Sequence, residues 1–178
     1  MNEQDLRAAF GDCKRPASSL CPVNTSFEYP EGYSFYVYDN EDNQPISIVE
    51  SSQDYHLTVR NHTNSPVCIV KTDKCLFTDE HKKCDCILFD AKNLFFVEMK
   101  NSAIGSRSAN RKKAAIQLGD TIQLFENNNI DFKKHTAKAI IYFKTNNTYP
   151  TQPSRNTLRA VFLEKYGVSL EEGNEIEF

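Results

Sequence analysis

The chain has 178 residues, a formal net charge of −3, and 39% hydrophobic residues. This length suits one domain, so residues 1–178 are expected to form a single α/β domain. No apolar run is long enough to span a membrane, and the acidic balance argues against coating nucleic acid through bulk charge. The N-terminal sequence MNEQDLRAAF lacks the pattern of a secretion signal, which predicts a cytoplasmic protein.

The N-terminal half of the chain reads as one short helix followed by strands. The helix is predicted over residues 3–10, and the proline-containing stretch that follows is expected to wrap the surface. Segments rich in β-branched and aromatic residues then alternate with polar turns. The four predicted strands are 33–38, 45–51, 55–61 and 66–72. Their spacing predicts an antiparallel meander that runs directly into the next hairpin.

Residues 84–100, CDCILFDAKNLFFVEMK, predict a β-hairpin that carries three charged side chains. Side chains two apart on a strand share a face, so Glu98 and Lys100 are expected to project together while the residue between them points away. If residues 90–93 form the turn, antiparallel pairing places Asp85 opposite Glu98. Two carboxylates and one ammonium would then meet on one patch.

The remainder of this hairpin is apolar on both faces, which predicts the covered centre of a sheet. In its first strand, Cys84, Cys86 and Leu88 are expected on one face, with Ile87 and Phe89 on the other. Burying charged groups at the ends of such strands lowers the stability of the fold by several kcal/mol, unless the groups are paired or bind a cation. A divalent ion would explain them, and a salt bridge between the lysine and either acid is the alternative.

An acidic residue on one strand and an acidic-x-Lys triplet on the next make residues 67–144 resemble the PD-(D/E)XK nuclease superfamily. This restriction-endonuclease-like fold is shared by restriction enzymes, Holliday-junction resolvases and defence-associated nucleases. The resemblance implies that Asp85 and Glu98 bind Mg²⁺ or Mn²⁺, and that Lys100 activates water or stabilises the phosphate. Cys84 replaces the proline that the family places before the first acid.

The resemblance also implies supporting residues outside the hairpin. Residues 107–126 are predicted to form a helix, on which Gln117 resembles the auxiliary glutamine of resolvase-like members and would hold water or phosphate. The alternative for Gln117 is an ordinary polar residue at the edge of an amphipathic helix. The family tends to add an acid from upstream of the core, and Glu50 and Asp73 are the candidates for this further metal ligand.

Basic residues gather at the start of the predicted helix, where free backbone N–H groups also favour phosphate. They are Arg107, Arg111, Lys112 and Lys113. We expect them to contact nucleic acid, with DNA favoured as the partner, and the alternative is a solvated helix face. No membrane partner is expected, and a homodimer remains an open alternative because many nucleases of this superfamily dimerise.

The C-terminal part completes a strand–helix–strand crossover. Residues 137–144 form a buried strand, so the central sheet is expected to be mixed and flanked by helices. A second helix is predicted over residues 154–167, with Ser154 as its cap, and the final EIEF is expected to add an edge strand.

Two further functions compete with the nuclease. The first is a catalytically inactive nuclease-fold module that senses nucleic acid or binds a protein partner. The second is a zinc-stabilised interaction protein, which rests on Cys68, Cys75, His81, Cys84 and Cys86. Their spacing does not follow the paired C-x₂-C pattern of common zinc modules, which favours buried thiols instead.

Overall fold

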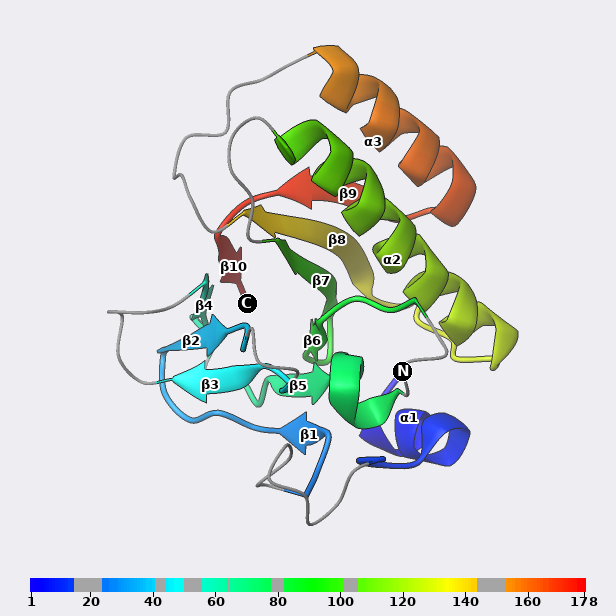
Figure 1. Ribbon diagram of the computed structural model, residues 1–178. Coiled ribbons are helices and arrows are strands. Elements are labelled where there is room, and N and C mark those ends of the chain that lie inside the picture. Colours follow the sequence, from blue (N-terminus) through cyan, green and yellow to red (C-terminus); the bar gives the residue numbers. More distant parts are fainter. Residues whose placement is uncertain are drawn as a thin grey trace.

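The described residues of the protein fold into two β-sheets and three main helices, as the computed structural model in Figure 1 shows. The structure describes residues 1–14, 24–40, 44–49, 56–63, 65–77, 82–100, 106–143 and 153–178. Among these, no helix is long and apolar enough to cross a membrane.

The larger sheet has six strands in the order β1-β5-β6-β7-β8-β9. Its strands are β1 (Phe27–Glu28), β5 (Cys68–Lys71), β6 (Cys86–Phe89), β7 (Asn93–Lys100), β8 (Thr136–Phe143) and β9 (Ser169–Glu172). The pairs from β1 to β7 are antiparallel, whereas β7–β8 and β8–β9 are parallel. The predicted α/β class with a mixed central sheet is therefore confirmed.

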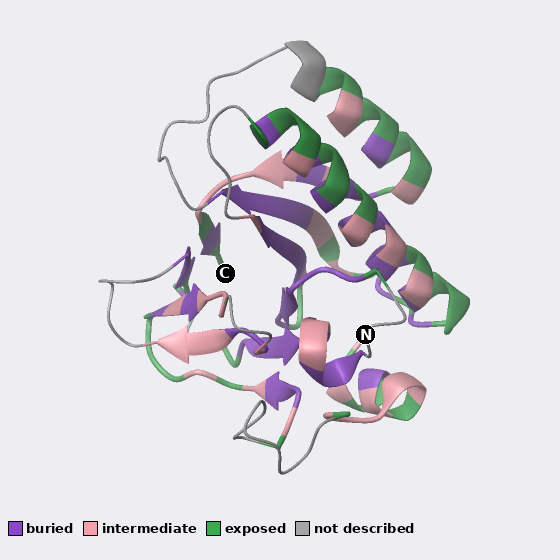
Figure 2. Ribbon diagram, in the orientation of Figure 1, coloured by how far each residue is buried: buried purple, intermediate pink, exposed green. Residues whose placement is uncertain are grey.

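The helices cover one face of the larger sheet (Figure 1). They are α1 (Glu3–Phe10), α2 (Arg107–Asn127) and α3 (Pro153–Tyr166). Helix α2 connects the parallel strands β7 and β8, as predicted, and its stripe Ala115, Leu118, Ile122 and Phe125 is buried. Figure 2 shows the buried part of α2 on the side that faces the strands. We call the resulting set of buried residues the helix-side cluster.

The second face of the larger sheet is covered by a smaller sheet, so within the described residues the helices flank one face only. Its order is β10-β4-β2-β3. Its strands are β2 (Ser34–Tyr38), β3 (Ser47–Val49), β4 (Leu57–Arg60) and β10 (Glu175–Glu177). Buried residues of both sheets meet between them in what we call the sandwich cluster. The predicted C-terminal edge strand is confirmed as β10, which pairs in parallel with β4.

The predicted meander is wrong in its pairing. Strand β2 lies between β3 and β4, and β5 leaves this sheet to join the larger one. Alternating apolar residues identify a strand and its buried face, but they do not identify its partners. The chain therefore changes sheets between Arg60 and Cys68, a step that local sequence does not signal.

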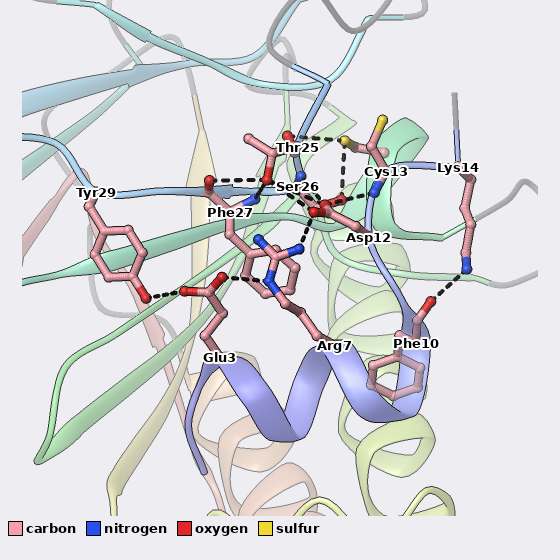
Figure 3. Close-up of polar contacts among 11 residues, drawn as sticks. Glu3, Arg7, Phe10, Asp12, Cys13, Lys14, Thr25, Ser26, Phe27 and Tyr29 are labelled. Atoms are coloured by element: carbon pink, nitrogen blue, oxygen red, sulfur yellow. Dashed lines mark hydrogen bonds and ion pairs between the residues drawn. The ribbon is translucent and has the colours of Figure 1, made fainter. Parts of the chain in front are cut away.

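Helix α1 is fixed to the edge of the larger sheet by polar contacts (Figure 3). Asn2 and Asp5 form a reciprocal capping box that starts the helix as predicted. From its last turn, Arg7 contacts Glu3 and Asp12. The Asp12 carboxylate in turn accepts the backbone N–H of Ser26 at 2.6 Å, which links the helix to the segment that enters β1.

The start of α3 differs slightly from the prediction. The helix begins at Pro153, so Ser154 lies within its first turn and is not its cap. Proline suits the first turn of a helix because the N–H that it lacks would have no partner there.

Close packing between α2 and α3 yields a first testable prediction. A Cβ atom on Gly119 would lie 2.3 Å from the Tyr166 hydroxyl oxygen. Gly119→Ala should therefore lower the free energy of unfolding by about 1–3 kcal/mol, despite the gain of about 1 kcal/mol in helix propensity. Urea denaturation of Gly119→Ala, Tyr166→Leu and the double variant measures the coupling. Stabilisation by Gly119→Ala in the parent background would contradict this packing.

Candidate metal and active site

The predicted register of the β6–β7 hairpin is confirmed. Cys86 pairs with Val97, and the ladder continues to Phe89 and Leu94 at the turn. The paired ladder ends at Cys86 and Val97, and Asp85 bonds Val97 as well, so the expected pairing of Asp85 with Glu98 is not formed, although both residues lie directly beyond the ladder. Both carboxylates therefore lie at the open end of the hairpin, away from its turn.

Asp85 forms a β-bulge where the strands separate. Its N–H donates to the Val97 carbonyl at 3.0 Å, although Val97 is also the partner of Cys86. The Asp85 Oδ2 atom accepts the N–H of Met99 at 2.5 Å. The extra residue shifts the side-chain alternation, so Cys84 joins the helix-side cluster and Cys86 the sandwich cluster. The expectation that these two cysteines share a face is thus wrong.

Glu98 and Lys100 project together from β7, as predicted, and Met99 packs into the sandwich cluster on the opposite face. The ammonium of Lys100 donates to Glu98 Oε1, so the strand-end salt bridge considered as the alternative is present. The Glu98 side chain is 0% exposed. Its Oε2 atom is buried without a hydrogen-bond partner among the residues that the structure describes. The salt bridge therefore gives a partner to only one of the two carboxylate oxygens of Glu98.

Burial is the main cause that raises the pKa of both acids above their ordinary values, and neighbouring carboxylates add to it. Burial, with a further contribution from the charge of Asp39, raises the pKa of Asp85 from 3.8 to about 7. Burial and the Asp85 charge raise the pKa of Glu98 well above its ordinary value, even though Lys100 opposes the shift. Burial would lower the pKa of Lys100, but the charge and hydrogen bond of Glu98, together with the charges of Asp85 and Asp39, outweigh it and the net shift is upward. One ammonium does not compensate two buried carboxylates.

Of the two upstream acids, Asp73 lies beside the hairpin and Glu50 lies outside the described residues. Asp73 belongs to the irregular helical turn η1 (Thr72–Leu76), and its N–H donates to the Asp85 carbonyl at 3.3 Å. Its Oδ1 atom lies 3.3 Å from the ammonium of Lys83, whose side chain is buried. Because Lys83 already balances its charge, Asp73 adds a neutral ion pair to the neighbourhood of Asp85.

Gln117 and Thr121, one turn apart on α2, support the chain segment that leads into Asp85. The Gln117 amide donates to the carbonyl of Lys83 at 3.1 Å. The buried Thr121 hydroxyl accepts the N–H of Cys84 at 2.9 Å and donates to the Gln117 carbonyl. The predicted contact of Gln117 with water or phosphate stays a prediction. Thr121 had no signal in the sequence, because its role depends on where β6 meets α2.

The support from Thr121 can be tested by one isosteric substitution. Thr121→Val keeps the side-chain shape but leaves the buried N–H of Cys84 unpaired, which should lower the free energy of unfolding by about 1–3 kcal/mol. Thr121→Ser keeps the hydroxyl and is the matched control. Chemical denaturation should therefore rank the valine variant below the serine variant, and the reverse order would refute the role of this hydroxyl.

The four basic residues at the start of α2 fall into two pairs. Arg107 and Arg111 are buried and lie over the Phe143 ring, at 5.4 and 5.7 Å from its centre. Phe143 is the cross-strand partner of Lys100, so both guanidinium groups are near the candidate site. Arg111 also pairs with Glu172 at 2.6 Å, with both side chains buried. The other two, Lys112 and Lys113, are exposed to solvent.

The described members of the candidate zinc set do not gather into one centre. Cys68 and Cys84 belong to the helix-side cluster and Cys86 to the sandwich cluster, while His81 lies outside the described residues. Within the described part of the chain, no three His, Cys, Asp or Glu side chains converge closely enough to ligate one metal ion. The Asp85–Glu98 pair is therefore the carboxylate site that the geometry offers.

Comparisons of the chain with protein-family models, curated proteins and solved structures found no match. Any assignment of function therefore rests on the residues and geometry of the hairpin.

Proposed function

We propose that the protein is a metal-dependent nuclease of the PD-(D/E)XK superfamily, with a restriction-endonuclease-like core at about residues 67–144. Its substrate would be a phosphodiester bond in nucleic acid, with DNA favoured. The observation that carries the proposal is the fully buried Glu98 Oε2, which has no hydrogen-bond partner among the described residues.

The two carboxylates fit a divalent cation by charge and by chemistry. A buried carboxylate oxygen without a partner costs free energy, and one lysine neutralises only one of the two acids. Mg²⁺ is usually held by one or two carboxylates, with water and substrate phosphate completing its coordination. Asp85 and Glu98 would hold the ion, so a third protein ligand is not required.

The roles of the residues follow from their charges. A bound divalent ion would supply positive charge at the phosphate and lower the pKa of water. Lys100 keeps its proton, because Glu98 raises the pKa of this lysine, so it would stabilise negative charge on the phosphate. Lys112 and Lys113 are exposed and could contact the nucleic-acid backbone, while Arg107 and Arg111 would contribute positive charge from beside Phe143.

The proposal is tested by incubating the protein with labelled single-stranded, duplex and branched DNA and with RNA, in Mg²⁺ or Mn²⁺. The control is an Asp85→Ala, Lys100→Ala double variant prepared in the same way. Cleavage by the parent alone is expected, and it would also identify the substrate class. The proposal fails if both proteins fold, neither cleaves any substrate, and the parent binds no metal. The inactive nuclease-fold binding module would then be the better account of the protein.

A further inference from the structure

Thr72, the first residue after β5, bonds twice to the segment that carries the Asp85 carboxylate. The residue is fully buried. Its hydroxyl donates to the Cys84 carbonyl, and its backbone N–H donates to the Asp85 carbonyl at 3.2 Å. The peptide group that joins Cys84 to Asp85 is therefore bonded at both ends, because its N–H donates to the Val97 carbonyl at 3.0 Å.

The side chain of Asp85 is not oriented by the regular pairing of the strands. The β5–β6 ladder ends at Lys71 and Cys86, and the β6–β7 ladder ends at Cys86 and Val97. Asp85 lies just beyond both ladders, in the bulge, where strand alternation no longer fixes the direction of a side chain. Its direction therefore depends on the individual hydrogen bonds to this segment.

Helix α2 holds the preceding peptide group, so the segment is fixed from two sides. The Lys83 carbonyl accepts the Gln117 amide at 3.1 Å, and the Cys84 N–H donates to the Thr121 hydroxyl at 2.9 Å. Two buried threonine hydroxyls thus bond to the backbone of Cys84, one to its N–H and one to its carbonyl. The Thr72 hydroxyl is the one that bonds the peptide group directly before Asp85.

We infer that Thr72 is a positioning residue for the proposed metal ligand Asp85, and that its hydroxyl strengthens the binding of a divalent ion. The inference rests on the proposed metal-binding function. Without the hydroxyl, the buried Cys84 carbonyl loses a hydrogen-bond donor, and the peptide group is no longer held in one orientation. A carboxylate attached to a less fixed backbone binds an ion more weakly, since ligands held in place in advance give tighter binding.

The test is calorimetric titration of the chelator-treated protein with Mn²⁺ at pH 8. Thr72→Val keeps the side-chain shape without the donor and should weaken Mn²⁺ binding by about 10–100-fold, the usual effect of losing a group that orients metal ligands. Thr72→Ser keeps the hydroxyl and should bind Mn²⁺ as the parent does. Thr72→Ala also lacks the hydroxyl but leaves room for water, so it decides the question if Thr72→Val does not fold.

Ile130→Val is the control for a general loss of stability. Ile130 is buried on the loop that leads from α2 to β8, and β8 begins beside Asn93 at the turn of the hairpin, away from Asp85. The loss of one buried methylene group should lower the urea midpoint. The affinity should not change, because the apparent affinity of a protein that remains folded does not depend on how stable it is. Circular dichroism checks that every variant is folded.

Each result decides the inference. Weaker Mn²⁺ binding by the folded variants without the hydroxyl, with parental binding by Thr72→Ser and Ile130→Val, supports it. Parental affinity in Thr72→Val or Thr72→Ala overturns the inference and leaves the proposed function standing. The inference is also overturned if Thr72→Ser loses as much affinity as the variants without the hydroxyl, or if Ile130→Val does. A parent that binds no Mn²⁺ overturns both the inference and the proposed function.

Discussion

Replacement of Glu98 by glutamine is expected to reduce phosphodiester cleavage by about a thousandfold or more. A metal ion supplies several kcal/mol of transition-state stabilisation, and each 1.36 kcal/mol corresponds to a factor of ten in rate. Glutamine keeps the size of the side chain and an acceptor for Lys100, but it removes the charge that would hold the ion. The measurement is the single-turnover rate on the best substrate at saturating Mg²⁺.

Glu126→Gln is the matched control for this substitution. Glu126 is an exposed acid at the last turn of α2, so its replacement should leave the cleavage rate within a factor of two or so of the parent. Circular dichroism should show that both variants fold. Undiminished cleavage by folded Glu98→Gln would remove Glu98 from the active site.

The second large effect concerns stability in the absence of metal. Burial, followed by the charge of Asp39, raises the pKa of Asp85 from 3.8 to about 7 in the folded protein. A group with a raised pKa adds stability at low pH, and that stability is lost as the pH rises through about 7. Asp85→Asn should therefore match the parent near pH 4 and exceed it by up to about 4 kcal/mol at pH 8, at about 1.36 kcal/mol per pH unit. Asparagine retains an oxygen that can accept the N–H of Met99.

Urea denaturation at several pH values, in a chelator, measures this difference. Saturating Mn²⁺ should then stabilise the parent at pH 8, by mass action, and not Asp85→Asn. Asp131→Asn should follow the parent at every pH, since its side chain is exposed. Lower stability of Asp85→Asn than of the parent at pH 8 would contradict this account. The Asp85 carboxylate would then stabilise the fold, whereas the account expects it to lower the free energy of unfolding at this pH.

Much of the candidate site could be predicted from sequence, because the position of the turn in a hairpin determines which residues of its two strands pair. The turn before Asn93 fixes the pairing of Cys86 with Val97, and strand alternation places Glu98 beside Lys100. The bulge at Asp85 could not be predicted, because an extra residue in a strand leaves no compositional trace. Thr121 was also missed, because its hydrogen bond with the N–H of Cys84 depends on how α2 packs against the segment before β6.

In the fold as well, features set by local sequence could be predicted, whereas features set by contacts between distant segments could not. Helices α1 and α2 and strands β7 and β8 follow from the pattern of apolar residues along the chain. The pairing of β2 with both β3 and β4 depends on contacts between segments distant in sequence. Strand β9 was not predicted, since SLEE has little apolar pattern and is held mainly by its parallel pairing with β8.

The most direct test of the metal site is calorimetric titration of the chelator-treated parent and of Glu98→Gln with Mn²⁺ at pH 8. The parent should bind a divalent ion, and Glu98→Gln should bind it far more weakly, because Oε2 of Glu98 is buried and has no hydrogen-bond partner among the described residues. Failure of the parent to bind Mn²⁺, or equal binding by both proteins, would contradict the assignment of Asp85 and Glu98 as metal ligands.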